Sequence, residues 1–317
     1  MSAPRGVPAL VWRDRRAQVG LALIAAFAVG AVVAPLLPGL AVGDLAGVVA
    51  RRFAGPLSRT PDGVWHLLGT DRFGRDVLAR LLAGARISLA VGMLAALVST
   101  AVGIGAGALA GYAGGAVDRA IVGVTDAALA VPRVPLLLLL VALVEPGAWV
   151  TVLALGVTGW MTVARLVRGE VRALEARPFV EAARALGFPP WRVLVRHVLP
   201  NALTPALVAA ALGVGSAIML EAGLSFLGLG VQPPTPSWGN MIASGRDALL
   251  IAPWVCLAPA SACTSIRRTL WTTSRASSGR RSGSTRRRWP RCGARCSRYR
   301  RRRPAPSCWG RAWCSRP

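Results

Sequence analysis

Lysine is absent from the 317 residues of the chain, and histidine occurs only as His66 and His197. A phosphate-binding loop of the Gly-x-x-x-x-Gly-Lys-Ser/Thr type needs its lysine to contact the nucleotide phosphates, so the chain is not expected to be an ATPase itself. The sequence also assembles no Ser/His/Asp or Cys/His catalytic constellation. We therefore predict no catalysis by this chain, no cofactor and no metal site.

Cysteine is missing from the first 255 residues, and acidic residues are missing beyond Asp247. The range 259–317 is rich in Arg, Ser and Cys, and it holds 17 of the 38 basic residues. Such a chain cannot bury enough apolar surface to fold, so we predict that this range is disordered. Its composition is typical of a GC-rich gene read out of frame, and we interpret it as an aberrant tail. An intact reading frame across codons 250–270 would refute that interpretation.

A functional tail is the alternative interpretation. Its arginines would suit nucleic acid or acidic lipid, and Cys292 and Cys296 would suit a metal ion. Metal-binding pairs usually come with a second pair at conventional spacing, which the tail does not have. We therefore expect neither a nucleic-acid partner nor a metal site there.

Long apolar runs dominate the rest of the chain, which is 54% hydrophobic overall and has a mean hydropathy of +0.50. A helix crosses the ~30 Å hydrocarbon core in roughly 20 residues, and backbone groups in lipid must be satisfied within helices. Five clear runs and a weaker sixth have about this length: 19–38, 87–110, 120–143, 149–167, 202–222 and 249–266. The sequence predicts an all-α polytopic membrane protein with five clear transmembrane helices and a weak or truncated sixth.

The distribution of arginine predicts how these helices are oriented. Residues 1–18 carry four arginines and one aspartate, which favours a cytoplasmic N-terminus. Residues 39–85 then form an external loop and an amphipathic segment, and residues 86–258 form the transmembrane core. Within that core, the segment 178–201 between the fourth and fifth helices lies in the cytoplasm.

The segment 178–201 has the local signals of a short helix with a sharp stop, from about residue 179 to 186. Pro178 suits the first helical turn, and Glu181 suits the positive N-terminal end of a helix. Gly187 ends the helix, and the two prolines after it prevent its continuation. From Glu181 the chain reads Glu-Ala-Ala-Arg-Ala-Leu-Gly-Phe-Pro-Pro-Trp-Arg-Val-Leu-Val-Arg-His-Val-Leu-Pro-Asn. This pattern resembles the EAA loop of the membrane subunits of ATP-driven (ABC-type) bacterial importers, which docks onto the ATPase.

Three further segments resemble signatures of one group of these importers. Residues 68–92 contain Gly-Thr-Asp-Arg-Phe-Gly-Arg-Asp, residues 111–119 read Gly-Tyr-Ala-Gly-Gly-Ala-Val-Asp-Arg, and residues 224–241 contain Leu-Ser-Phe-Leu-Gly-Leu-Gly-Val-Gln-Pro-Pro. They are similar to the dipeptide, oligopeptide and nickel permeases, and in particular to the C-type membrane subunit. The resemblance covers about residues 10–258 and is lost from about residue 260.

The resemblance implies a permease of the bacterial inner membrane that moves peptides, or a related small solute such as nickel, across the lipid bilayer. It implies as partners a second homologous permease subunit, two cytoplasmic ATP-binding subunits that hydrolyse ATP, and an external substrate-binding protein. An ion-gradient-driven secondary transporter is the alternative. That class usually shows internal repeats, and no convincing repeat is visible in this sequence.

The resemblance also assigns ATPase coupling to residues of the EAA loop: Glu181, Ala182, Ala183, Arg184, Gly187, Leu199 and Pro200. The alanines would leave a flat surface that fits a groove of the ATPase, although helix propensity explains them equally well. Arg184 would pair with acidic residues of that groove.

Charged residues in or near the apolar runs are costly in lipid and are expected to face the protein interior. The group consists of Asp126, Arg133, Glu145 and Glu221. For Asp126 and Glu221 two interpretations stay open, a structural hydrogen-bonding role and a place along the translocation path.

Two other patterns lead to structural expectations. Gly103, Gly107 and Gly111 recur every four residues, which favours close packing of the second transmembrane helix against another helix. Trp238 follows a proline-rich turn, and its preference for membrane interfaces predicts a cap at the outer surface. The charged residues from Asp71 to Asp76 are interpreted as ion-paired surface structure.

Overall fold

The computed structural model describes residues 51–278, except 60–62 and 64, together with six positions between residues 18 and 30. Those six positions are helical, but most of the predicted first transmembrane helix, 19–38, lies outside the described residues. Residues 1–17 and 279–317 lie outside them as well. The expectations for the N-terminus and for the end of the tail therefore stay predictions.

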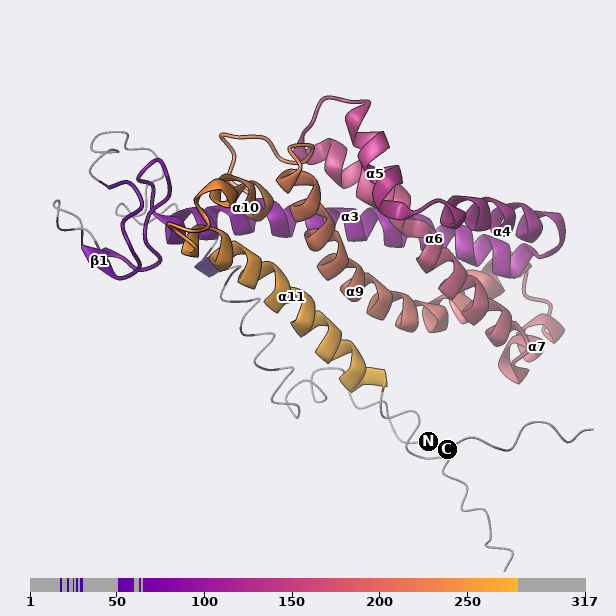
Figure 1. Cartoon of the computed structure of the whole chain (residues 1–317). Coiled ribbons are helices and arrows are strands. Elements are labelled where there is room, and N and C mark those ends of the chain that lie inside the picture. The colour runs from indigo at the N-terminus through magenta and orange to yellow at the C-terminus, as the bar shows by residue number, and fades with distance from the viewer. Residues whose placement is uncertain are drawn as a thin grey trace, which may run out of the picture. The chain divides into compact units, whose positions relative to one another are not determined.

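The described part of the chain is built from helices, with one small sheet (Figure 1). Strand β1 (Ser58–Arg59) pairs antiparallel with β2 (Trp65–His66) in the loop before the first long helix. The helices follow in this order: α3 (Val77–Ala113), α4 (Gly115–Ala130), α5 (Arg133–Ala142), α6 (Ala148–Glu175), α7 (Pro178–Ala185), α8 (Pro190–Val193), the π-helix η3 (Leu194–Val198), α9 (Leu199–Phe226), α10 (Trp238–Gly245), the 3-10 helix η4 (Arg246–Ala248) and α11 (Trp254–Ser278). The predominantly helical class expected from the sequence is confirmed.

Three helical stretches of the described residues are long and apolar enough to cross a membrane. They are α3, α6 and the stretch Pro190–Phe226, which joins α8, η3 and α9. They contain the predicted transmembrane helices 87–110, 149–167 and 202–222. The stretches number four if the bent pair α4 and α5 counts as one span. The expected total of five helices and a weak sixth stays a prediction.

Helices α3 and α6 lie against each other. Gly103 lies against Val163 and Gly111 lies against Val171, which shows that the two helices run in the same direction. Cβ atoms added at Gly103, Gly107 and Gly111 would stand 2.6, 2.5 and 2.8 Å from the nearest atoms of α6. Real Cβ contacts are longer, so the glycines allow the two backbones to approach this closely. The packing role expected for this glycine stripe is confirmed.

The predicted helix 120–143 is two helices in the structure. Helices α4 and α5 are bent by 88° at the break between them. Val131 and Pro132 at this break have ψ angles of 128° and 125°, and proline disfavours helical conformation for the residue before it. The predicted run 120–143 is therefore a bent pair of helices and not one continuous helix. Since α3 and α6 run in the same direction, the α4–α5 pair leads the chain back from the end of α3 to the start of α6 (Figure 1).

Helix α3 begins ten residues earlier than the predicted transmembrane run, because Asp76 caps its N-terminus. The Asp76 carboxylate accepts a hydrogen bond from the Ala79 N–H at 2.9 Å. Such a cap satisfies one of the backbone donors that a helix start leaves unpaired. Residues 77–85, which the sequence predicted as the end of the external loop and amphipathic segment, therefore belong to the same continuous helix as the predicted transmembrane run 87–110.

Ion pairs hold the loop before α3, as expected from the sequence. Asp71 accepts a hydrogen bond from Arg75 Nε at 2.9 Å and one from Arg80 Nη1 at 3.1 Å. The Nδ1 atom of His66 lies 2.6 Å from Oδ2 of Asp76. The second pair joins strand β2 to the start of α3.

Helix α11 continues through residues 259–278, which the sequence predicted as the start of a disordered tail. That prediction is wrong for these residues. Ala262, Cys263 and Ile266 are buried in the cluster formed with α3, α9 and α10, so this part of the chain has enough apolar side chains on one face to pack. Residues 279–317 lie outside the described part.

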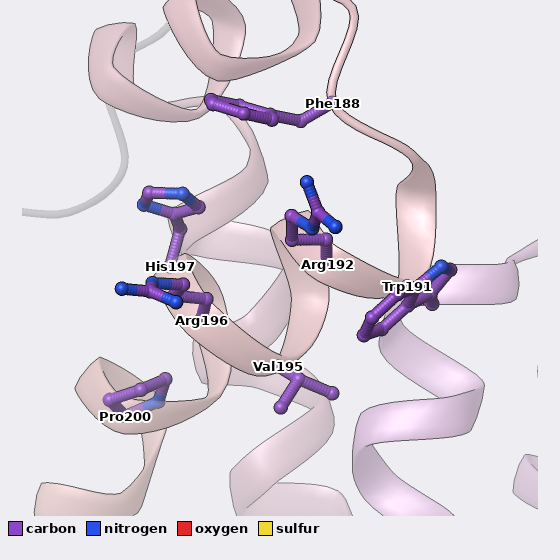
Figure 2. Close-up of a pocket in the computed structure, with 7 residues that line it drawn as sticks. All are labelled: Phe188, Trp191, Arg192, Val195, Arg196, His197 and Pro200. Atoms are coloured by element: carbon purple, nitrogen blue, oxygen red, sulfur yellow. The ribbon is translucent and has the colours of Figure 1, made fainter.

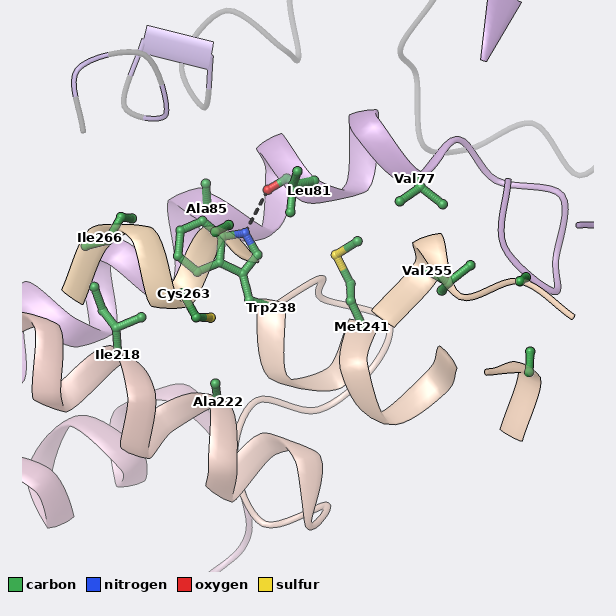
Figure 3. Packing of buried hydrophobic residues seen from close by; sticks show 13 residues of the cluster. Val77, Leu81, Ala85, Ile218, Ala222, Trp238, Met241, Val255, Cys263 and Ile266 are labelled. Carbon is green, nitrogen blue, oxygen red and sulfur yellow. Dashed lines mark hydrogen bonds between the residues drawn. The ribbon is translucent and has the colours of Figure 1, made fainter. Parts of the chain in front are cut away.

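One end of the helix bundle packs around Trp238 of α10 (Figure 3). Trp238 is fully buried beside Ala85, Ile218 and Met241, and its indole N–H donates to the Leu81 carbonyl oxygen at 3.0 Å. Trp238 is thus enclosed by the protein, and the expected cap at the outer membrane surface stays a prediction. A tryptophan prefers the interface when its N–H needs a wet partner, and here a buried carbonyl satisfies it.

Candidate functional site

Helix α7 forms where the sequence predicts a short helix in the EAA loop. Pro178 occupies its first position, where the missing N–H costs no hydrogen bond. Beyond the last turn, Gly187 has a φ of +76°. Its N–H donates to the Arg184 carbonyl at 2.9 Å, and the Phe188 N–H donates to the Ala183 carbonyl at 3.3 Å. This pair of bonds is a Schellman motif, which favours glycine at the left-handed position, and the predicted helix end is confirmed.

The inner face of α7 is fixed to the helix bundle. Val180 and Ala183 are buried in an apolar cluster with Val171 of α6, Val193 of α8 and Ala202 of α9. Residues three apart lie on the same side of a helix, so both side chains of α7 enter one cluster. A displacement of α7 would therefore act on α6 and α9 through direct packing.

The predicted flat alanine surface is divided between the two faces of α7. Ala182 and Ala185 are exposed, together with Glu181, whereas Ala183 is 5% exposed. Ala183 thus anchors α7 to the bundle and is not part of a surface that an ATPase could meet.

Arg184 has partners within this chain. Its Nη2 atom lies 2.8 Å from Oε1 of Glu175 at the end of α6, and its guanidinium lies 5.6 Å from the centre of the Tyr112 ring at the end of α3. These contacts tie α7 to the ends of two long helices. The Arg184 side chain is 49% exposed, so the expected pairing with acidic ATPase residues would either add to the Glu175 pair or replace it.

Beyond the turn, the chain runs from Pro190 into α9 without a break. The π-helix η3 carries the chain from α8 into α9, and the Leu199 N–H donates to the Leu194 carbonyl. Leu199 packs against the same apolar cluster as α7, and Pro200 is exposed. Short π-helical segments often occur at functional sites.

A groove of about 900 Å³ lies between the turn after Gly187 and the start of α9 (Figure 2). It is lined by Phe188, Trp191, Arg192, Val195, Arg196, His197 and Pro200. The Phe188 and His197 rings stack across it with centroids 6.1 Å apart, and Trp191 is 63% exposed. The groove and the exposed Leu186 together form an apolar surface that also contains basic residues. We call this surface the coupling surface. Of the predicted coupling residues, Pro200 lines the groove. The sequence prediction missed Phe188 and Trp191, although aromatic residues in a basic loop could have indicated a binding surface.

Asp118 is a second residue that sequence reasoning missed. Its carboxylate is buried at the start of α4, and it accepts hydrogen bonds from Arg168 Nη2 at 2.8 Å and from Arg172 Nη2 at 2.5 Å. It thus joins α4 to α6. Asp126, one of the two candidates for the translocation path, pairs with Arg165 where both side chains are exposed on this chain.

Glu221, the other candidate, is fully buried in α9. It accepts hydrogen bonds from Ser88 Oγ at 2.9 Å and from Ser225 Oγ at 2.8 Å. Ser88 in turn accepts from the Trp238 N–H at 3.2 Å, and Ser225 accepts from the Val231 N–H at 3.0 Å. Glu221 therefore joins α3, α9 and the segment after α9, which favours its structural role over a place along the path.

Comparison with known proteins places these features in a family. A dipeptide transport permease, DppC of Alkalihalophilus pseudofirmus, is 37% identical over 247 residues, which cover 78% of this chain and 79% of the relative. An oligopeptide transport permease, OppC of Mycobacterium tuberculosis, is 42% identical over 207 residues, 63% of this chain and 70% of the relative.

The fold has a counterpart among solved structures. A chain of the inward-facing MetNI methionine ABC transporter superposes with a TM-score of 0.50 at 19% identity, and the match covers 62% of this chain and 95% of that chain. The model of the binding-protein-dependent transport system inner membrane component family matches residues 103–270. The match extends past residue 260, where the sequence resemblance was expected to end. The chain belongs to the family of binding-protein-dependent transport system inner membrane components.

Proposed function

We propose that this chain is the permease subunit of an ATP-driven importer that moves peptides across the bacterial inner membrane and that its coupling surface meets a cytoplasmic ATPase. The observation that carries the coupling role is the construction of α7. Its inner face is buried against α6, α8 and α9, while exposed apolar groups stand beside it. Apolar groups of this kind on a rigid support are typical of a protein interface.

The peptide class is supported by the relatives, which are named as dipeptide and oligopeptide permeases. Those names favour peptides over nickel as the substrate. The partners that fit this role are a second homologous permease, two cytoplasmic ATP-binding subunits and an external substrate-binding protein. We place residues 1–18 and the coupling surface on the cytoplasmic side, since both carry several arginines.

The mechanism that fits these parts is alternating access. ATP binding would close the paired ATPases and draw the α7 helices of the two permeases together. Because α7 packs directly on α6 and α9, the movement would reach the long helices and open the bundle outward to receive a peptide. Hydrolysis would then reset the inward-facing state, with ATP consumed by the partner subunits and no catalytic residue supplied by this chain. An ion-gradient-driven transporter is disfavoured by the family membership, and proton-coupled uptake by the purified chain alone would support it.

The coupling role is tested by Gly187→Val and Glu181→Lys in the complex reconstituted with its partners. Valine is strained at a φ of +76°, and Glu181→Lys reverses the charge in the first turn of α7. Both variants should assemble but lose most of the peptide-stimulated ATP hydrolysis. Gly187→Asn is the matched control, because asparagine tolerates the left-handed region, and it should retain stimulation. Normal stimulated hydrolysis in Gly187→Val and Glu181→Lys would refute the coupling role.

A further inference from the structure

A cavity of about 340 Å³ lies between α3, α6 and α9, in the middle third of each of these long helices. Its volume is at the lower end of the range for ligand pockets, about 300–1,000 Å³. Much of its wall consists of alanine and glycine residues, whose small size leaves the space open. The polar groups that line it are Ser99, Thr100, Arg133, Thr162 and Ser216.

Arg133 reaches this cavity from outside the three helices. It is the first residue of α5, directly after the bend that breaks the predicted helix 120–143. Its Nη2 atom donates to the Leu155 carbonyl oxygen at 3.3 Å, and a Cβ atom added at Gly159 would stand 3.3 Å from the same Nη2. The absence of a side chain at Gly159 and the bend before α5 together make room for the guanidinium at mid-height of the bundle.

The charge of Arg133 is not balanced by a carboxylate of the described residues within ion-pairing distance. A guanidinium has five N–H donors, and the long bond to Leu155 uses one of them. An arginine between apolar helices is costly unless it pairs, so its usual roles are substrate binding or ion passage. The remaining donors of Arg133 thus have no carboxylate partner among the described residues.

A second observation at the same cavity also indicates a missing ligand. Thr100 is 8% exposed, and its buried hydroxyl has no hydrogen-bond partner. Buried hydroxyl groups are normally paired. The hydroxyls of Ser99 and Ser216 donate to carbonyls of their own helices, at 3.1 and 3.3 Å, which leaves their oxygen atoms able to accept hydrogen bonds. The cavity thus combines a cation and a free hydroxyl with acceptors that suit N–H groups.

We propose that Arg133 and Thr100 form a transient binding site for the C-terminal carboxylate of a peptide during its passage. Guanidinium and carboxylate pair through charge-assisted, often bidentate hydrogen bonds, and the hydroxyl acceptors would receive peptide N–H groups. Arg133 is exposed on this chain, so the site opens toward the surface where a second permease would complete the path. The proposal rests on the peptide-import function proposed above.

The test uses the full complex with partner permease, ATPases and binding protein in proteoliposomes, supplied with radiolabelled Gly-Leu at saturation. Arg133→Gln should lower the amount of dipeptide imported per ATP hydrolysed by about tenfold, the size of a lost charge-assisted hydrogen bond, and Thr100→Val by about threefold. Arg133→Lys should restore most of the import, because it keeps the charge. Arg86→Gln, which removes an exposed charge from α3, should import as the unaltered complex does.

The outcomes separate this proposal from the proposed function. If the unaltered complex imports no dipeptide and shows no stimulated hydrolysis, the import function itself fails. If it imports dipeptide and Arg133→Gln imports equally well per ATP, the binding site is refuted and the function stands. Loss of co-purification of the partner permease with Arg133→Gln would also overturn the site, because Arg133 would then pair with a carboxylate of that subunit.

Discussion

The two ends of helix α3 are packed in different ways. Near its N-terminus, a large buried side chain and buried polar groups fix the structure: Trp238 donates to Leu81, and Glu221 joins Ser88 to Ser225. Near its C-terminus, α3 and α6 meet through glycines, and α7 is attached by small apolar side chains and an exposed ion pair. Directional hydrogen bonds permit one arrangement, whereas smooth apolar contacts permit small displacements. At the second end Asp118 still joins α4 to α6 by directional bonds, so α7, held by apolar side chains and one exposed ion pair, is the element suited to transmit a partner's movement.

Two tryptophans, one at each end, illustrate this difference in packing. Trp238 has no exposed surface, while Trp191 at the other end is 63% exposed. An exposed tryptophan in the coupling surface contributes little to the folding of the isolated chain, and tryptophan is among the residues that contribute most to protein interfaces. The comparison predicts opposite consequences when each is removed.

Trp238→Ala should produce the largest loss of stability, about 3–5 kcal/mol, because it leaves a large cavity where a fully buried indole was packed. Trp191→Ala should change the free energy of unfolding by less than about 0.5 kcal/mol and should instead weaken co-purification with the ATPase. Unfolding of both variants in detergent micelles, followed by circular dichroism, measures the first effect. Equal destabilisation by the two substitutions would contradict the difference between the ends.

Gly107→Ala should have an intermediate effect. The added methyl group would stand 2.5 Å from the Ala164 carbonyl oxygen, whereas at Gly105, on the other side of α3, it would meet nothing within 4 Å. We expect Gly107→Ala to cost about 1–3 kcal/mol through overpacking, and Gly105→Ala to be neutral or stabilising because alanine is the better helix former. The same unfolding measurement compares the two variants, and a Gly107→Ala protein as stable as Gly105→Ala would show that α3 and α6 separate without cost.

Local signals in the sequence were sufficient for some of these features. Gly187 ends α7 because it takes the left-handed position of a Schellman motif, and that requirement depends on neighbouring residues alone. The bend at Pro132 is also a local effect, but a long apolar run concealed it.

Other features depend on partners that are distant in the sequence. Ala183 and Arg184 were assigned to the ATPase surface, whereas their neighbours lie on α3 and α6. The burial of Trp238 likewise depends on Leu81, whose carbonyl accepts the indole N–H although it is 157 residues away. A prediction of the groove at Trp191 would have required the path of the chain through α8 and η3, which the spacing of residues along the sequence does not reveal.

A small effect on stability is expected for Arg184→Gln, and its effect on ATP hydrolysis decides what the ion pair at the end of α7 does. The pair is exposed, with 49% of the Arg184 side chain and 23% of the Glu175 side chain accessible, and exposed pairs contribute about 0–1 kcal/mol to stability. If the pair serves to hold α7 on α6, Arg184→Gln and Glu175→Gln should reduce stimulated ATP hydrolysis equally, and the double variant should add nothing further. If Arg184 leaves Glu175 to bind the ATPase, Arg184→Gln alone should abolish stimulation, and Glu175→Gln should preserve it or raise it because the competing carboxylate is gone.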